Sequence, residues 1–105
     1  MASAVPQLEQ ARKIVLADPT HYPDIVTGIS SIIGSGSALD AQRWGAEFMA
    51  ETFASPIVAG SVKEKMCTGV IPILKDWLEN QHDEAVLRSA IQTAASLYPY
   101  VFRFV

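Results

Sequence analysis

The sequence predicts an all-α protein, and three observations lead to this class. Apolar residues recur at spacings of three and four along nearly the whole chain, which is the period of an amphipathic helix. No stretch shows the sustained apolar/polar alternation of a half-buried strand. Of the 105 residues, 50% are hydrophobic and only 18% are charged, which excludes disorder for most of the chain. We therefore predict one helical domain over residues 1–105.

Five helices are expected, because five segments carry an apolar stripe on one side. In chain order they span about residues 6–17, 19–33, 38–54, 57–79 and 83–104. Their stripes are Leu8, Ala11 and Val15; Ile25, Ile29 and Ile33; Ala41, Trp44 and Phe48; Met66, Val70, Ile73 and Trp77; and Leu87, Ala90, Ala94 and Leu97. A surface helix buries such a stripe against neighbouring helices.

Proline and glycine mark the ends of the first helices. Asp18 before Pro19 is typical of an N-cap followed by the first helical residue, so the second helix begins at 19, or at Pro23 after a tight turn. The glycines at 34 and 36 end this helix, and the third helix follows them.

The later boundaries depend on two further prolines and one polar turn. The fourth helix begins after Pro56, at about 57 or later at Ser61. Pro72 lies inside it and removes one backbone hydrogen bond, so a bend is predicted there. A polar turn at 80–83 precedes the last helix. All the connections are short, so consecutive helices should be antiparallel.

An internal repeat refines the fold class. A shift of 45 residues, from 43 to 88, aligns an Arg, then a small residue two positions later, then an apolar helix that ends in an aromatic residue. The aligned pairs are Arg43–Arg88, Gly45–Ala90, Ala46–Ile91, Ala50–Ala95 and Phe53–Tyr98. A period of about 40–47 residues made of two helices is the signature of HEAT and armadillo arrays. We therefore predict a HEAT/armadillo-like α-solenoid fragment of about five antiparallel helices, in which the small residues Gly45 and Ala90 let the following helix approach closely.

The last eight residues predict an open end. They are rich in large apolar side chains, whereas the last helix of an array usually has a polar outer face. The fragment is therefore expected to be truncated at its C-terminal end. Tyr100, Phe102 and Phe104 would then face water and form a repeat-stacking or self-association surface, with concentration-dependent oligomers.

Composition excludes several function classes. Eight Lys and Arg against eleven Asp and Glu give a net charge of −3, so direct nucleic-acid binding is not expected. A single cysteine cannot form an internal disulfide, which fits a reducing compartment. Neither a secretory signal nor a membrane-spanning segment is recognisable, so we expect an intracellular protein without membrane contact.

Residue types that could carry chemistry do not converge on a site. Cys67 lies between apolar positions of the fourth helix and is interpreted as a structural thiol, because a nucleophilic cysteine needs an activating neighbour. His21 and His82 are far apart and, with one cysteine, give no set of three or four zinc ligands. We expect no metal site.

Two other patterns have structural interpretations. Glu47 and Glu51 form an i, i+4 pair on a solvated helix face, where Arg43 would neutralise Glu47. The Gly-Ser run at 34–37 lacks the Lys-Ser/Thr of a phosphate-binding loop. No catalytic residue and no cofactor are therefore expected, and we predict that the chain is not an enzyme.

The fourth helix carries the predicted partner contacts. It is the second helix of its pair, and second helices line the concave side of HEAT arrays. Glu64, Thr68 and Lys75 project away from its apolar stripe. We predict that they contact a protein partner.

Residues from about 18 to 101 resemble the N-terminal HEAT domain of the symplekin family. Four segments carry the resemblance: Asp18-Pro19-Thr20 at the start of a helix, the Arg-containing helix at 40–51, the Val-Ile-Pro-Ile-Leu segment at 70–74, and the stretch from Asp83 to Tyr98, which is the most similar. The resemblance implies a non-catalytic scaffold of the nuclear mRNA cleavage and polyadenylation machinery. It also implies binding to a phosphatase of the RNA polymerase II C-terminal domain.

Three other readings of the sequence remain open at this stage. The chain could be a HEAT or armadillo segment of another scaffold, such as a transport receptor or a kinase-associated solenoid. It could also be a small helical enzyme or regulator, although no nucleophile, base and orienting group converge. A helical DNA-binding domain is opposed by the negative net charge.

Overall fold

The computed structural model describes residues 3–101, which form five α-helices and one short 3₁₀-helix. The α-helices are α1 (Val5–Ala17), α2 (Tyr22–Ile33), α3 (Leu39–Ala54), α4 (Gly60–Asn80) and α5 (Glu84–Val101), and the 3₁₀-helix η1 (Pro19–His21) precedes α2. No strand occurs within residues 3–101. The predicted all-α class and the five predicted helices are confirmed.

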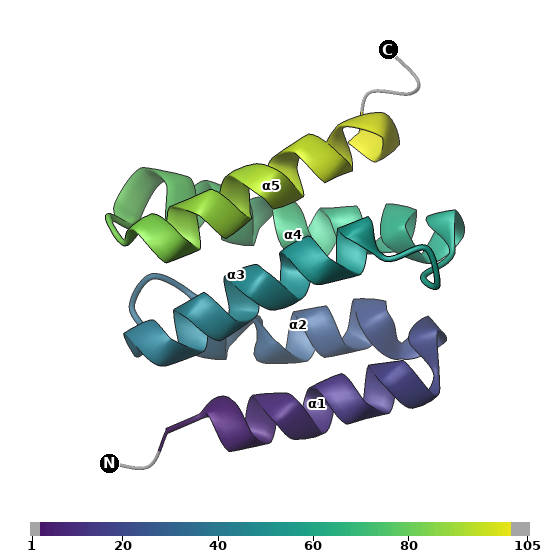
Figure 1. Ribbon diagram of the computed structural model, residues 1–105, viewed down its shortest axis with the longest axis horizontal. Helices are drawn as coiled ribbons and strands as arrows, with labels where there is room; N and C mark the ends of the chain where they lie inside the picture. The colour runs from purple at the N-terminus through teal and green to yellow at the C-terminus, as the bar shows by residue number, and fades with distance from the viewer. Residues whose placement is uncertain (1–2, 102–105) are drawn as a thin grey trace.

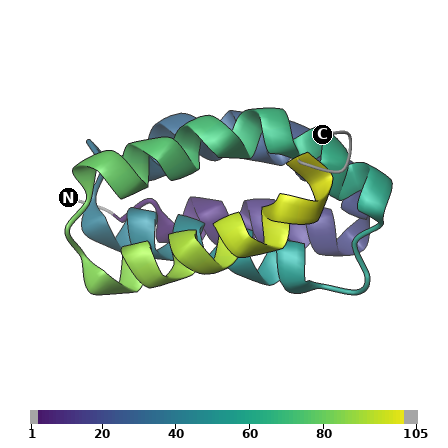
Figure 2. The same cartoon turned by 90° about the horizontal axis from the view of Figure 1, so that it is seen from above.

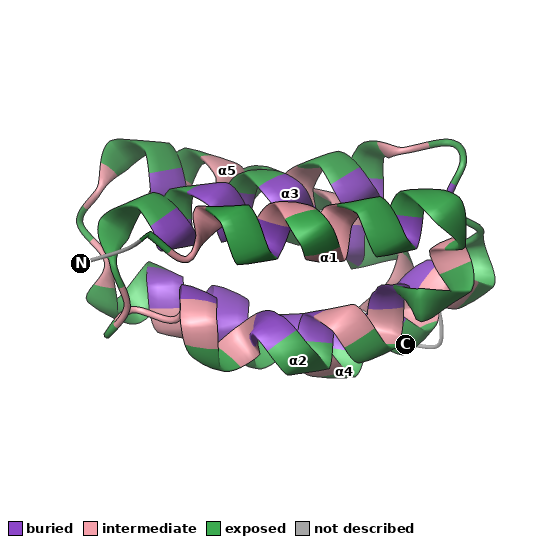
Figure 3. Cartoon of the chain, turned by 90° about the horizontal axis from the view of Figure 1, so that it is seen from below, coloured by how far each residue is buried: buried purple, intermediate pink, exposed green. Residues whose placement is uncertain are grey.

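The helices stack in two layers, and consecutive helices run antiparallel (Figure 1). One layer holds α1, α3 and α5, and the other holds α2 and α4 (Figure 3). Within the layers, α3 packs on α1 and α5, and α2 packs on α4; between them, α2 contacts α3 and α4 contacts α5. The result is a slab with principal extents of 43 × 31 × 18 Å, whose two layers are seen from above in Figure 2.

Two helix starts follow from local hydrogen bonding and burial. Asp18 Oδ1 accepts a hydrogen bond from the Thr20 amide at 3.1 Å, which stabilises the η1 turn, and α2 begins only after it. The predicted start of the fourth helix at 57 is wrong, because residues 55–59 form a bend that buries Val58 in the core and α4 begins at Gly60. The α4 helix then continues without interruption through Pro72.

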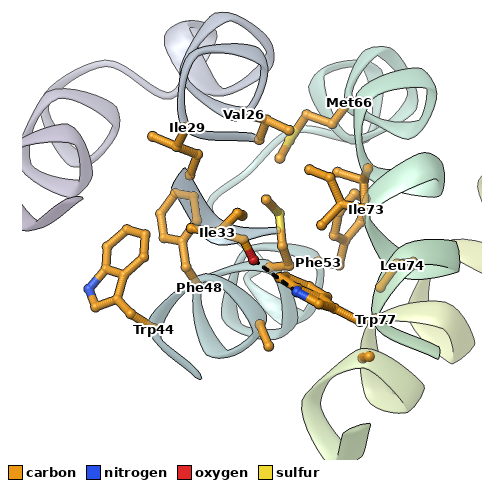
Figure 4. Close-up of a cluster of buried hydrophobic side chains, with 14 of the residues drawn as sticks. Val26, Ile29, Ile33, Trp44, Phe48, Phe53, Met66, Ile73, Leu74 and Trp77 are labelled. Carbon is orange, nitrogen blue, oxygen red and sulfur yellow. Dashed lines mark hydrogen bonds between the residues drawn. The ribbon is translucent and has the colours of Figure 1, made fainter. Parts of the chain in front are cut away.

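The core lies between the two layers and connects them (Figure 4). Trp77 of α4 is fully buried, and its indole Nε1 donates a hydrogen bond to the Ile33 carbonyl at 2.9 Å. Phe48 of α3 stacks on Trp44 at 4.9 Å between ring centroids, and the Arg12 guanidinium of α1 lies 5.2 Å from the Trp44 ring. These contacts bring four of the five α-helices into one core.

A glycine permits the close approach of α2 and α3. A Cβ atom built on Gly45 would lie 2.8 Å from three side-chain atoms of Ile33, which is too close for any real carbon contact. The predicted close approach occurs at this residue, but the helix that approaches is the preceding α2 and not the following helix. Its repeat partner Ala90 is completely buried in α5.

Candidate protein-interaction surfaces

The three predicted partner-binding residues lie along one stripe of α4, which we call the outer stripe. Thr68 and Lys75 are exposed, and Glu64 is half-buried. Lys75 Nζ pairs with Glu79 Oε1 at 4.0 Å, one helical turn further on. The geometry permits contact with a partner, and that these residues make it stays a prediction.

Cys67 is an inert thiol. It is only 7% exposed, and its Sγ donates a weak hydrogen bond to the Lys63 carbonyl at 3.3 Å. Burial raises the pKa of the Cys67 thiol, and the negative charge of Glu64 raises it further. The thiol form therefore dominates near neutral pH, which does not suit a nucleophile.

The predicted self-association end is placed differently from expectation. Tyr100 is half-buried rather than fully exposed, and its ring lies 6.5 Å from the Phe53 ring, tilted by 56°. The helical period turns Tyr98 outward instead, and this side chain is 63% exposed. Phe102 and Phe104 lie outside the described residues.

An apolar groove with a volume of about 500 Å³ lies between α4 and α5. We call it the α4–α5 groove. Its apolar lining comprises Ile71, Leu74 and Leu78 from α4 and Ala94, Leu97, Tyr98 and Val101 from α5, with Lys75 and Glu79 at its edge. Sequence analysis missed this site, because Ile71 and Leu78 fall outside the apolar stripe that α4 buries.

Asp76 ties the end of α4 to the loop between α2 and α3. Its carboxylate accepts hydrogen bonds from the Ser35 amide at 2.7 Å and from the Ser35 hydroxyl at 2.6 Å. Asn80 donates to the same carboxylate at 2.9 Å. These donors, Ser35 above all, hold the pKa of Asp76 below its usual value.

Arg43 joins α3 to the start of α5. Its guanidinium makes two hydrogen bonds to Asp83, at 2.6 and 3.2 Å, and Asp83 also accepts from the Val86 amide at 3.1 Å as a helix cap. Pairing with Arg43 lowers the pKa of Asp83. The expected pairing of Arg43 with Glu47 is therefore wrong, because the capping carboxylate lies within bidentate reach.

Other polar residues discussed in the sequence analysis form ion pairs with neighbouring side chains and do not gather into one site. Glu51 pairs with Arg12 at 3.5 Å, and His21 lies 3.4 Å from Asp18. Across residues 3–101, no three His, Cys, Asp or Glu side chains are placed to hold a metal ion. The arrangement offers noncovalent contact surfaces: the apolar groove and the polar outer stripe of α4.

Comparisons with known protein families, with curated proteins and with solved structures find no match to this chain. In the part of the chain that the structure describes, no helix has both the length and the apolar character needed to span a membrane.

Proposed function

We propose that the chain is a segment of a HEAT- or armadillo-type α-solenoid that acts as a non-catalytic protein-binding scaffold. The proposal rests on the 45-residue repeat, because this shift relates the packed pair α2 and α3 to the packed pair α4 and α5. Moving α2 and α3 forward by 45 residues places them on α4 and α5, and the pairs are in contact in both cases. Solenoids bind partners along extended surfaces made of such repeated units.

The surfaces of the molecule support binding. The α4–α5 groove exposes large apolar side chains, including Leu78 at 46% and Tyr98 at 63%. Contiguous exposed apolar surface of this kind marks interaction sites in soluble proteins. The outer stripe of α4 adds Thr68 and Lys75 as exposed polar contacts on the same helix.

Within this class, we propose membership of the symplekin family and a nuclear role in mRNA 3′-end cleavage and polyadenylation. The proposal is supported by the order and spacing of the four similar segments, the most similar of which, Asp83 to Tyr98, forms the cap and most of α5. The partners would be polyadenylation-factor subunits and a phosphatase of the RNA polymerase II C-terminal domain. The resemblance covers the region from Asp18, just before η1, to the end of α5.

Affinity capture from nuclear extract tests this role, with the purified chain as bait. We expect enrichment of polyadenylation factors, and direct binding of the purified phosphatase. A double variant of exposed outer-stripe residues, Thr68→Glu with Lys75→Glu, should reduce this capture, and Lys13→Glu on α1 is the matched control because it reverses one exposed lysine elsewhere. Capture of transport or kinase subunits in place of polyadenylation factors would contradict the symplekin proposal.

A further inference from the structure

Ser55 is the only serine or threonine followed by proline among the 105 residues. It follows α3 in an extended conformation, with φ −74° and ψ 127°, and begins the bend at 55–59 that leads to α4. Pro56 is exposed and Ile57 is 79% exposed, whereas Ser55 itself is half-buried. Its hydroxyl oxygen accepts one hydrogen bond, from the Ile57 amide at 3.3 Å. An extended Ser-Pro segment outside regular secondary structure is the form of substrate that proline-directed protein kinases take.

A buried lysine lies next to this serine without a counter-charge. The Lys63 ammonium donates a hydrogen bond to the Ser55 carbonyl at 2.8 Å. Lys63 is only 7% exposed, yet it forms no ion pair with any residue from 3 to 101. Buried charges in proteins are normally paired, because the desolvation of an unpaired ion is costly. An anion on Ser55 would supply the missing charge.

Arg12 is the second cation near Ser55, and both residues line a hollow of about 190 Å³. Figure 1 shows the end of α1 and the bend after α3 at the same end of the slab. The Arg12 guanidinium lies 5.2 Å from the centre of the Trp44 ring, which holds it by packing. The oxygens of Glu9 and Glu51 that pair with it lie 3.9 and 3.5 Å from its nitrogens, and its Nε has no hydrogen-bond acceptor. The guanidinium therefore keeps hydrogen-bonding capacity for an anion.

We propose that Ser55 is a phosphorylation site of a proline-directed protein kinase and that its phosphate binds Lys63 and Arg12. In the transfer, Ser55 Oγ attacks the γ-phosphorus of ATP, an Oγ–P bond forms, and the bond from that phosphorus to the β-phosphate oxygen breaks to release ADP. The hydroxyl proton passes to the catalytic carboxylate of the kinase. Phosphoserine carries a charge of about −1.5 to −2 and three strong acceptor oxygens, which suit two cations. This site is independent of the scaffold function proposed above.

Two neighbours oppose the phosphate, and both effects are weak. Ser55 is the C-cap of α3, where the helix dipole is negative, but Lys63 already donates to this end of the helix. Glu51 repels a phosphate, but its side chain is 53% exposed and is free to turn into water. Charge-assisted hydrogen bonds to two cations outweigh these effects. Because Arg12 belongs to α1 and Lys63 to α4, the phosphate would tie the first helix to the fourth.

Phosphorylation of the full chain tests the site, with a cyclin-dependent kinase and a mitogen-activated protein kinase as the enzymes. Mass spectrometry should find one phosphate, on Ser55, and none on the Ser55→Ala variant. The thermal midpoint of the phosphorylated chain should rise by at least about 4 °C over that of the unphosphorylated chain. Arg12→Gln and Lys63→Gln should each lose most of this rise. Lys13→Gln is the matched control, because it removes an exposed lysine next to Arg12 and should keep the rise.

Each variant is compared with its own unphosphorylated form, so that effects on folding cancel. A ³¹P NMR titration then reports on the contact itself. The second pKa of phosphoserine is about 6 in water, and contact with two cations should lower this pKa. The pKa should return toward about 6 in Arg12→Gln and in Lys63→Gln, and stay low in Lys13→Gln.

Three results would overturn the proposal. The first is the absence of phosphate on Ser55 with both kinases. The second is a thermal midpoint and a phosphate pKa that Arg12→Gln and Lys63→Gln leave unchanged. The third is an equal rise of the midpoint when the unphosphorylated chain is placed in inorganic phosphate, because the two cations would then serve a free anion.

Discussion

The α4–α5 groove repeats, 45 residues later, a set of buried positions of α2 and α3 that we call the covered socket: Val26, Ile29, Ile33, Met49 and Phe53. The two differ in what lies over them. Ile33 is completely buried beneath α4, while its repeat partner Leu78 is 46% exposed. The residue types are alike, so the difference does not come from the local sequence. It comes from the helices that pack on the earlier positions: α4 packs on α2 and α5 packs on α3, whereas no helix follows α5 within residues 3–101.

The largest expected effect is at Trp77, the α4 residue that packs on the covered socket and binds the Ile33 carbonyl. Trp77→Ala should lower the free energy of unfolding by about 3–5 kcal/mol, because it removes a fully buried indole and leaves a cavity. The hydrogen bond to the Ile33 carbonyl is lost as well. Urea unfolding followed by circular dichroism measures the change. A loss below about 1 kcal/mol would show that α4 does not seal the socket.

A matched pair of substitutions compares the two sites directly. Ile33→Ala should cost about 2–5 kcal/mol of unfolding free energy, as expected for a buried aliphatic side chain. Leu78→Ala should cost less than about 1 kcal/mol, because nearly half of the side chain is already in water. Equal losses in urea unfolding would mean that the open groove is covered in the isolated chain.

Two glycines sharpen the comparison between packed and open helix faces. In Gly45→Ala, overpacking against Ile33 should lower the free energy of unfolding by about 1–3 kcal/mol. The higher helix propensity of alanine offsets about 1 kcal/mol of this loss. Gly28→Ala in α2 should stabilise the protein by up to about 1 kcal/mol, since the added Cβ meets no atom within 4 Å beyond its chain neighbours and the nearby backbone of its own helix. Thermal unfolding of both variants gives the signs, and the same sign for both would contradict the close approach at Gly45.

The smallest expected effect concerns Asp76, which ties α4 to the loop that follows α2. Its folded-state pKa is lowered from 3.8 by the Ser35 hydrogen bonds, so its contribution is present above pH 4 and lost as the pH falls through the folded value. Asp76→Asn should cost about 1 kcal/mol near pH 7. The difference from the parent should shrink in acid, as urea unfolding at several pH values will show. A constant difference across this range would contradict the role of the carboxylate charge.

The sequence predicted the helices well, because each has a continuous stripe and is bounded by Pro, Gly or polar residues. It left the start of α4 open between 57 and Ser61, and the observed start at Gly60 agrees with the later position; the choice depends on burial of Val58, which is a tertiary contact. Nor did it predict the bond from Arg43 to Asp83, which joins residues 40 positions apart.

The exposed apolar surface at the C-terminal end of the described residues was predicted only in part. The apolar C-terminal end drew attention to Tyr100, but the rotation of α5 buries this side chain partly and exposes Tyr98. The groove forms only because α4 and α5 lie side by side, which is a tertiary contact. Ile71 and Leu78 stand out as uncovered positions only when their exposure is compared with the burial of Val26 and Ile33. Hydrophobic periodicity identifies the apolar face of each helix, but it does not show which parts of that face no other helix covers.

The most direct test of the repeated socket appends a second copy of residues 60–80 after Val105 through a flexible linker long enough to return along α5. The linker raises the effective concentration of the helix at the groove. If the open groove repeats the covered socket, the thermal midpoint should rise by at least about 4 °C, which corresponds to ~1 kcal/mol for a domain of this size. Leu78→Glu should cancel this rise. An unchanged midpoint, or the same rise in the Leu78→Glu chain, would contradict the account.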